Sequence, residues 1–264
     1  MKRRLSRRRF VARTAVAAGA VAAGLHLPAM VSAAAEGWGD LTGRFLYDGT
    51  PPERRKLTVD KDIECCGKFD IRDESLMVGP DGGLANVFVY VRSRGVEICP
   101  ELEASVEKDV LLDNRDCIFI PHCMTIWYEK QQYYVVNSDP VAQNVAFTPL
   151  GDVPVNKIIP VGGEFRHQFG RKQTLPVKVA CNYHPWESAY VLPLDHPYAA
   201  VSAADGTFTI PKLPAGDLEF QVWHEKIGYL DTPQWTGGRF EMTIQPGTND
   251  LGTVKIDPAW LVES

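Results

Sequence analysis

The sequence predicts an all-β protein built from β-sandwiches. Short runs rich in Val, Ile, Tyr and Phe are alternating or apolar, and Gly, Pro and Asp-Gly turns separate them. Long helical periodicity is missing from the sequence, and only Glu101–Lys108 is a candidate for a short helix. Because many short strands without helices bury their apolar faces against one another, we expect paired sheets.

The expected strands follow from these runs in chain order. They are Leu41–Tyr47, Asn86–Arg92, Ile118–Tyr128, Tyr133–Asn137, Val177–Ala180, Thr207–Ile210, Glu219–Trp223, Arg239–Ile244 and Leu251–Ile256. Asp205-Gly206 is typical of a tight turn between two strands, and Pro214-Ala215-Gly216 is typical of a second one.

The first 35 residues have the features of an export signal. Ser6-Arg7-Arg8-Arg9-Phe10-Val11 resembles the twin-arginine signal, and Ala33-Ala34-Ala35 is a small-residue cleavage site before Glu36. The alternative is a transmembrane anchor, which Arg13 and His26 in the Ala/Gly stretch disfavour. We therefore expect a periplasmic or cell-envelope protein, exported by the twin-arginine route, whose mature chain does not insert into the membrane.

The charge of the mature chain excludes nucleic acid as a partner. Removal of residues 1–35 takes away seven of the 28 basic residues and none of the 33 acidic ones, which leaves a formal charge of −12. The remaining basic residues are not clustered, so an anionic polymer or lipid surface has no basic patch to bind. An acidic surface favours a soluble monomer and cationic partners.

The segment Cys181-Asn182-Tyr183-His184-Pro185-Trp186-Glu187 carries the clearest chemistry. A thiolate and an imidazole three residues apart, on a loop between strands, can reach one soft metal ion. Blue-copper sites hold copper with two His and one Cys, together with a weak axial Met. The segment resembles the copper loop of amicyanin-like cupredoxins, Cys-x-x-His-x-x-Met, with Glu187 at the position of the Met.

The resemblance to cupredoxins covers most of residues 104–195. It extends over three further stretches, Phe119-Ile120-Pro121, Tyr134–Asp139 and Gln143–Phe147. Carried over, it implies the ligand set Gln143, Cys181, His184 and Glu187 in place of His, Cys, His and Met. Copper is the implied cofactor and a redox protein the implied partner. The two oxygen donors imply a weaker or different metal, such as Zn(II) or a red-type Cu(II) centre. His122 is an additional candidate ligand.

The flanking stretches resemble a transthyretin-like module of the carboxypeptidase regulatory kind. The resemblance rests on Gly39–Asp48 before Pro51-Pro52, and on Pro197–Val201, Asp205–Ile210 and Leu213–Gly216. It implies that residues 36–103 and 196–264 form one sandwich, with a cupredoxin-like Greek-key sandwich inserted at 104–195. An insert with adjacent ends costs little. The composite resembles exported proteins related to methylamine-utilisation proteins.

Six cysteines in an exported chain indicate at least one disulfide. The family resemblance implies a bond between Cys66 and Cys117, which the chain-entropy model values at roughly 4 kcal/mol. Bonds from Cys65 to Cys99 or to Cys123 remain open alternatives, whereas a bond between the neighbours Cys65 and Cys66 would be strained.

A metal-free module is the alternative function. Cys181 and His184 can be ordinary buried loop residues, in which case the chain is an envelope structural module or binds a protein or carbohydrate. For such binding, Trp235 is the aromatic residue expected to be exposed. Trp223-His224-Glu225 is interpreted as a strand end with the His and Glu at its rim. Asp60 and Asp62 are interpreted as solvated charges.

We do not expect an enzyme. Cys181 and His184 have no third orienting group in the sequence, as a nucleophilic site would require. Glycine-rich phosphate loops and the His-Glu-x-x-His zinc-protease pattern are missing from the sequence as well.

Overall fold

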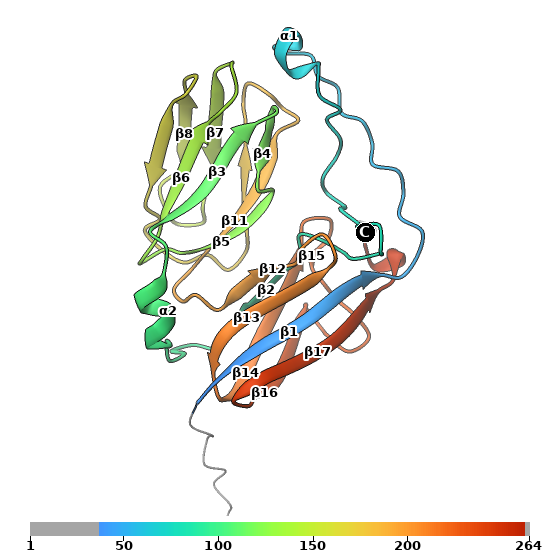
Figure 1. Ribbon diagram of the computed structural model, residues 1–264, viewed down its shortest axis with the longest axis vertical. Coiled ribbons are helices and arrows are strands. Elements are labelled where there is room, and N and C mark those ends of the chain that lie inside the picture. The colour runs from blue at the N-terminus through green and yellow to red at the C-terminus, as the bar shows by residue number, and fades with distance from the viewer. Residues whose placement is uncertain (1–36, 262–264) are drawn as a thin grey trace, which may run out of the picture. The chain divides into compact units, whose positions relative to one another are not determined.

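The computed structural model describes residues 37–261, so the predicted export signal lies outside the described residues. Strands dominate this part of the chain (Figure 1), which confirms the predicted all-β sandwich class. The elements are β1 (Trp38–Tyr47), α1 (Ile63–Cys66), β2 (Phe88–Val91), α2 (Pro100–Ser105), β3 (Asp109–Arg115), β4 (Ile118–Ile120), β5 (Cys123–Trp127), β6 (Gln132–Asn137), β7 (Gln143–Phe147), β8 (Val155–Ile159), β9 (Glu164–His167), β10 (Val177–Ala180), β11 (Ser188–Leu194), β12 (Ala199–Val201), β13 (Thr207–Pro214), β14 (Gly216–His224), β15 (Gly228–Tyr229), β16 (Arg239–Ile244), β17 (Gly247–Ile256) and a 3₁₀ turn (Pro258–Leu261).

Strands from both ends of the described chain form the first pair of sheets. One sheet has the order β13-β1-β17, and the other has the order β12-β2-β14-β15 with β16 also paired to β14. In Figure 1, β1 lies between β13 and β17, antiparallel to the former and parallel to the latter. Every second side chain of a strand points to the same face, and these faces enclose a core that includes Leu41, Phe45, Val89, Phe208 and Phe220.

The strands between residues 109 and 194 form the second pair of sheets. Their orders are β5-β11-β10-β7-β8 and β4-β3-β6-β9. The core between them includes Leu112, Tyr133, Val145, Val179 and Val191. Cys181 joins this core at the end of β10, so the candidate metal loop is continuous with the packed interior.

The two connections between the sheet pairs lie next to each other. β2 and β12 are antiparallel partners, with Tyr90 opposite Ala199. The hydroxyl of Tyr198 accepts from the backbone N–H of Cys99 at 2.9 Å and donates to the carbonyl of Glu97 at 2.9 Å. This proximity is what an inserted sandwich requires. The division at 103/104 and 195/196, and the transthyretin-like assignment, stay predictions.

Three sequence-based expectations are wrong. The run Ile118–Tyr128 is two strands in different sheets, because Pro121 has no N–H to continue the ladder after β4. Trp235 is only 8% exposed, since it packs on Phe45 and Phe240 in the first core. His224 is fully buried instead of lying at a rim. Trp235 and His224 are placed by packing against distant strands that no local pattern reveals, whereas Pro121 is itself a local signal.

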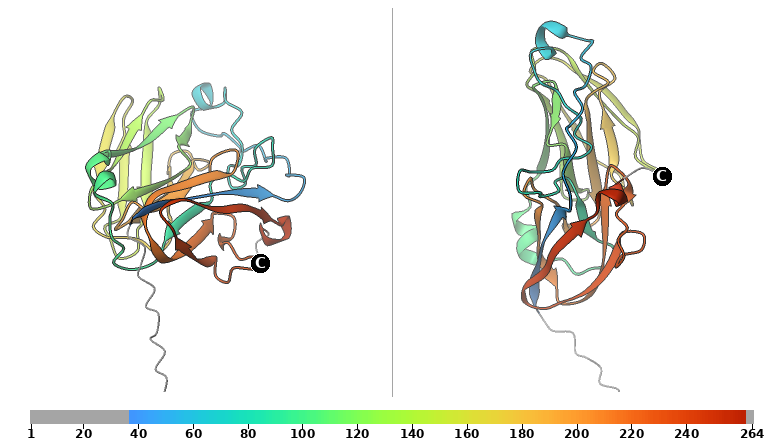
Figure 2. Two further views of the ribbon diagram at one scale, coloured as in Figure 1. Left: turned by 60° about the horizontal axis from the view of Figure 1, so that its bottom comes forward. Right: turned by 90° about the vertical axis from the view of Figure 1, so that its right-hand side faces the viewer.

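A long connection between β1 and β2 carries the short helix α1 and is seen along its length in Figure 2. We call residues 52–75 of it the cap segment. Its two limbs run side by side, with a bridge between Lys56 and Arg72 and with hydrogen bonds from Leu57 to Ile71 and from Asp73 to Arg55. The disulfide between Cys66 and Cys117 joins the tip of the segment to the turn between β3 and β4.

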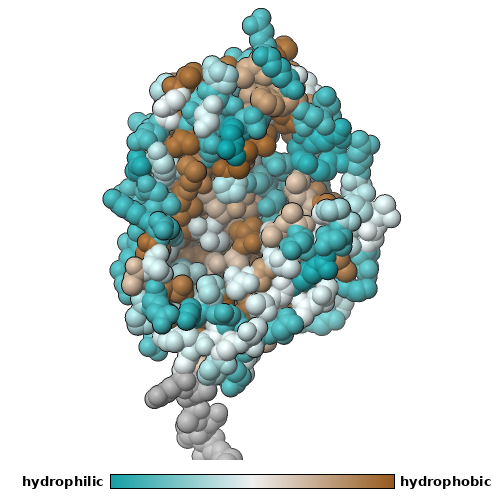
Figure 3. All heavy atoms as spheres, in the orientation of Figure 1, coloured by the Kyte–Doolittle hydropathy of each residue, from teal (hydrophilic) through white to brown (hydrophobic). Residues whose placement is uncertain are grey.

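The face of the molecule in Figure 3 is mainly hydrophilic at its margins, with hydrophobic residues gathered around a hollow near its middle. Most large apolar side chains are buried, and the exposed exceptions include Leu150, Val153, Ile158 and Val161. Among residues 37–261, no helix has the length and apolar character needed to cross a membrane.

Candidate metal centre

The candidate site is assembled from two neighbouring strands. Cys181 follows the last residue of β10, Gln143 opens β7, and these strands pair with Ala180 opposite Ala146. The loop after Cys181 is closed by its own backbone. The amide of His184 donates to Cys181 Sγ at 3.3 Å, and the amide of Glu187 donates to the carbonyl of His184 at 2.9 Å. The short loop therefore turns its side chains back toward Cys181.

The four predicted ligands come together. Cys181 Sγ lies 3.7 Å from His184 Nδ1 and 3.5 Å from Gln143 Oε1. His184 Nδ1 lies 2.7 Å from Gln143 Oε1 and 3.2 Å from Glu187 Oε1. Exposure is 0% for Gln143 and His184, 2% for Cys181 and 1% for Glu187. Sulfur, nitrogen and oxygen donors thus face one another in a water-excluded pocket.

Glu187 is the unusual member of this group. Neither carboxylate oxygen has a hydrogen-bond partner, although both are buried. The nearest ring nitrogen, His184 Nδ1, is engaged by Gln143 Oε1 at the shorter distance. Burial raises the pKa of Glu187, against the attraction of the neighbouring His184 ring. A buried carboxylate without hydrogen bonds is costly unless a cation or a proton compensates it.

His184 is surrounded by acceptors on both sides of its ring. Burial opposes its charge, but its contacts with Cys181, Glu187 and Asp62 outweigh burial and raise the pKa of His184 to about 10. Its Nε2 lies 2.8 Å from Asp62 Oδ2. An acceptor oxygen thus lies within 2.8 Å of each ring nitrogen, which favours a protonated imidazole in the metal-free site, and a metal bound at Nδ1 would have to displace that proton.

Two carboxylates that the sequence did not point to complete the site. Asp62 keeps an exposed side chain, as expected, yet it also bonds His184 across 122 residues of sequence. Asp139 Oδ2 accepts from Gln143 Nε2 at 2.8 Å, and the Asp139 carboxylate accepts from the amide of Cys117. In the sequence, the one signal for the position of Asp62 near the site is that it lies three residues before Cys65-Cys66. The cap segment thus covers the site through Asp62. Trp186 of the candidate metal loop packs against the cluster of Cys66, Ile71 and Cys117, and its Nε1 donates to the carbonyl of Cys117 at 2.9 Å.

His122 does not join the group. It precedes β5, and β11 separates β5 from β10 in their sheet. Its Nε2 lies 2.7 Å from Glu225 Oε1, and its Nδ1 lies 3.6 Å from Glu74 Oε2. His122 therefore belongs to a second cluster, which links the cap segment and the end of β14 to the edge of the sheet at β5.

We expect a pH-dependent contribution to stability from this second cluster. Burial opposes the charge on His122. The hydrogen bond and the charge of Glu225 outweigh burial and raise the pKa of His122, and the charge of Glu74 makes a smaller contribution in the same direction. Because the pKa of His122 is higher in the folded state than its unfolded value of about 6.5, protonation of His122 adds stability that is fully present below about pH 6.5. This stability is lost as the pH rises through the pKa of His122 in the folded state. Each unit of the rise is worth about 1.4 kcal/mol.

Glu225→Gln should therefore destabilise the protein more near pH 6 than near pH 9, as measured by urea unfolding at both values. The His122 ring signals in NMR should titrate at a lower pH in this variant. Glu241→Gln, on an exposed position of β16, is the matched control. An equal loss of stability at both pH values would contradict the assignment.

The structure contains the disulfide between Cys66 and Cys117. The alternatives that joined Cys65 to Cys99 or Cys123 are wrong, because each of these cysteines is free. Cys99 and Cys123 are buried in different places, the first beside Tyr198 and the second at the start of β5. Cys181 is free as well, as a metal ligand must be.

Comparison with known proteins finds likeness at the level of structure alone. No protein family model matches the sequence, and no curated protein matches it. The chain is similar to a Cu(I) form of an amicyanin variant at 13% identity and a TM-score of 0.28, over 40% of this chain and 98% of amicyanin. It is similar to a purple cupredoxin from Nitrosopumilus maritimus at 18% identity and a TM-score of 0.27, over 33% of this chain and 100% of that one. A copper-containing nitrite reductase from Thermus scotoductus matches at 13% identity and a TM-score of 0.29, over 39% of this chain and 25% of the enzyme.

Proposed function

We propose that this protein is a cupredoxin-derived metal-binding protein whose altered site holds a borderline divalent cation in place of blue copper. The ligands are Cys181 Sγ, His184 Nδ1, Glu187 and Gln143 Oε1. Zn(II) accepts this mixture of sulfur, nitrogen and oxygen donors, and Cu(II) would give a red-type centre. Bound metal would supply a compact positive charge at the centre of the group.

The buried Glu187 carboxylate is the observation that carries this proposal. It is 1% exposed and has no hydrogen bond to either oxygen, with the His184 ring as its nearest charged neighbour at 3.2 Å. A cation between the carboxylate and the Cys181 thiolate would compensate both negative charges in the place where water cannot.

The distances among the donors support four-coordinate binding. A tetrahedral ion with Zn–S of about 2.3 Å and Zn–N of about 2.1 Å holds its sulfur and nitrogen ligands about 3.6 Å apart. The Cys181 to His184 separation is 3.7 Å. The same geometry places nitrogen and oxygen ligands about 3.4 Å apart, near the 3.2 Å between His184 and Glu187. Gln143 Oε1 lies 2.7 Å from Nδ1, closer than two ligands of one ion, so it would hold the metal only with its amide oxygen farther from the ring.

The donor set argues against a blue-copper centre. That centre needs two imidazoles and one thiolate in a plane, with a weak axial ligand. Here Gln143 stands where the second imidazole is required, and a carboxylate stands at the axial position. Electron transfer to a redox protein partner therefore belongs to the ancestry of the fold, and a present-day binding role without catalysis fits these residues better.

The cellular setting of the proposal comes from the sequence. Ser6–Val11 and the Ala33–Ala35 site support export by the twin-arginine route to the periplasm or cell envelope. The transthyretin-like sandwich would act as the carrier of the inserted metal-binding sandwich, and the mature chain would be a monomer.

Metal titration of the mature chain tests the proposal. Zn(II) and Cu(II) should each bind with one-to-one stoichiometry by isothermal calorimetry, and Cys181→Ser should weaken binding at least 100-fold. Cys99→Ser, which removes another buried free thiol, should leave affinity unchanged. Affinity should rise with pH because the His184 proton competes with the metal.

A metal-free module is the competing function, and one observation favours it. The protonated His184 ring already neutralises part of the buried charge by its contacts with Gln143, Glu187 and Asp62. If neither metal binds, or if Cys181→Ser binds as tightly as the parent protein, this function replaces the one proposed.

A further inference from the structure

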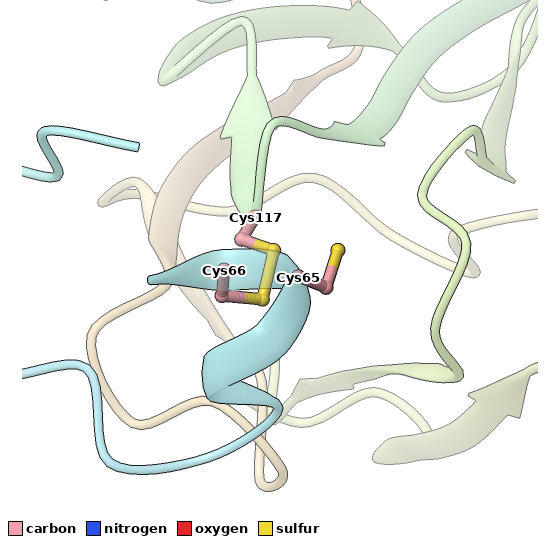
Figure 4. Close-up of side chains that lie close together, drawn as sticks. All are labelled: Cys65, Cys66 and Cys117. Atoms are coloured by element: carbon pink, nitrogen blue, oxygen red, sulfur yellow. A yellow bond between two sulfur atoms is a disulfide. The ribbon is translucent and has the colours of Figure 1, made fainter. Parts of the chain in front are cut away.

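Three sulfur atoms, those of Cys65, Cys66 and Cys117, lie together at the end of α1. This group is separate from that of Cys181, His184 and Glu187. Figure 4 shows Cys66 and Cys117 joined by their disulfide, with the Cys65 side chain beside them and unbonded. All three sulfur atoms lie within 4.8 Å of one another. A thiol thus stands within a small movement of a disulfide that it is not part of.

Exposure differs sharply within this group. Cys66 and Cys117 are 0% exposed, whereas Cys65 is partly exposed. A thiol from solution cannot reach the buried disulfide directly. The sulfur that can both exchange protons with solvent and approach the disulfide is that of Cys65.

We propose that Cys65 is an exchange thiol, so that Cys117 forms its disulfide with either Cys66 or Cys65. The Cys65 thiol loses its proton to solvent, and the thiolate attacks the sulfur of Cys117. A Cys65–Cys117 bond forms as the Cys66–Cys117 bond breaks, and Cys66 leaves as a thiolate and takes up a proton. The number of disulfides is unchanged, so the step needs neither oxidant nor reductant.

Attack at the other sulfur of the bond is disfavoured. It would join Cys65 to Cys66, and a disulfide between sequence neighbours strains the preferred geometry. Cys117 is therefore the fixed partner, and the two α1 cysteines are the alternatives.

The exchange would alter the cover of the candidate metal centre. Successive residues of a helix point about 100° apart, so transfer of the bond from residue 66 to residue 65 turns α1 relative to Cys117. Asp62 precedes this helix and bonds His184 Nε2 at 2.8 Å. The two disulfide isomers would thus hold Asp62 differently against His184. The exchange itself does not depend on whether metal binds.

Cys66→Ala in the mature chain tests the proposal most directly. We expect Cys65 to take over the bond to Cys117, so that this variant has three free thiols instead of five in a denaturing thiol assay. Peptide mapping without reductant should identify the Cys65–Cys117 linkage. Cys65→Ala is the matched control, because it keeps the bond between Cys66 and Cys117 and should also have three free thiols. Cys117→Ala removes the shared partner of both bonds and should have five free thiols.

The parent protein provides a second measurement that does not depend on a variant folding. Burial and the charge of Asp139 raise the pKa of the Cys65 thiol, so the incubation is done at mildly alkaline pH. After acid quenching and alkylation, modified Cys66 should appear together with the Cys65–Cys117 peptide. The proposal is overturned if Cys66 stays unmodified in the parent protein, or if folded Cys66→Ala contains five free thiols.

Discussion

Gln143→His combined with Glu187→Met should turn this protein into a blue-copper protein. Loaded with Cu(II), the double variant should show the intense blue thiolate-to-copper absorption of a trigonal site, which we do not expect from the donor set of the parent protein. The physical reason is the donor set, because a second imidazole near Cys181 and His184 completes two His and one Cys, and a thioether supplies the weak axial ligand. Gln143 Oε1 already lies 3.5 Å from Cys181 Sγ and 2.7 Å from His184 Nδ1.

The same change removes the two features that oppose soft copper. The buried Glu187 carboxylate, which has no hydrogen bond, is removed, and His184 loses the nearby negative charge that favours its protonated form. We expect copper affinity to rise by at least 100-fold in a competition assay with a chelator. Each single variant should give a weaker band, and Cys181→Ser in the double variant should abolish it. A colourless Cu(II) complex of the double variant would show that the loop cannot form a trigonal site.

Cys117→Ala should cause the largest loss of stability among the single substitutions considered. The disulfide closes a loop of 51 residues, for which the chain-entropy model gives about 4 kcal/mol. Cys117 is also fully buried in a small cluster with Cys66 and Ile71, so the substitution removes packing in addition to the bond. Neither Cys65 nor Cys66 can replace the bond once this partner is gone.

Guanidinium unfolding of the oxidised variant and parent measures this loss. Cys66→Ala should lose clearly less stability than Cys117→Ala, because Cys65 remains available to Cys117. Cys99→Ala, at another buried cysteine, controls for the cost of a small cavity. If Cys117→Ala and the control unfold at the same denaturant concentration, the cap segment is held by its other contacts.

Most of the fold was predictable because strands and turns are local. The runs Val177–Ala180 and Arg239–Ile244 coincide with β10 and β16, and the turn at Ala215 separates β13 from β14. Helical or extended periodicity and the special backbone freedom of Gly and Pro act within a few residues, so they can be read from neighbours. Pro121 is a local signal for a break in the run Ile118–Tyr128, but that its two halves join different sheets is decided only by the tertiary structure.

The ligand set of the candidate centre was also local in large part. Cys181, His184 and Glu187 lie on one loop, and the resemblance to cupredoxins placed Gln143 beside them. Their mutual distances and complete burial came only from the pairing of β7 with β10.

The amino-acid sequence by itself determined the all-β class, the turns and the short Cys181–Glu187 loop, because each depends on residues close together in the chain. Tertiary structure alone decided that Asp62 covers His184, that His122 bonds Glu225, and that Trp235 is buried. These contacts join residues about one hundred or more positions apart, or depend on a packed core. The stabilisation that these contacts provide depends on the burial and the charges of the folded chain. A local pattern of residues does not determine which side chains are buried together or which charges meet.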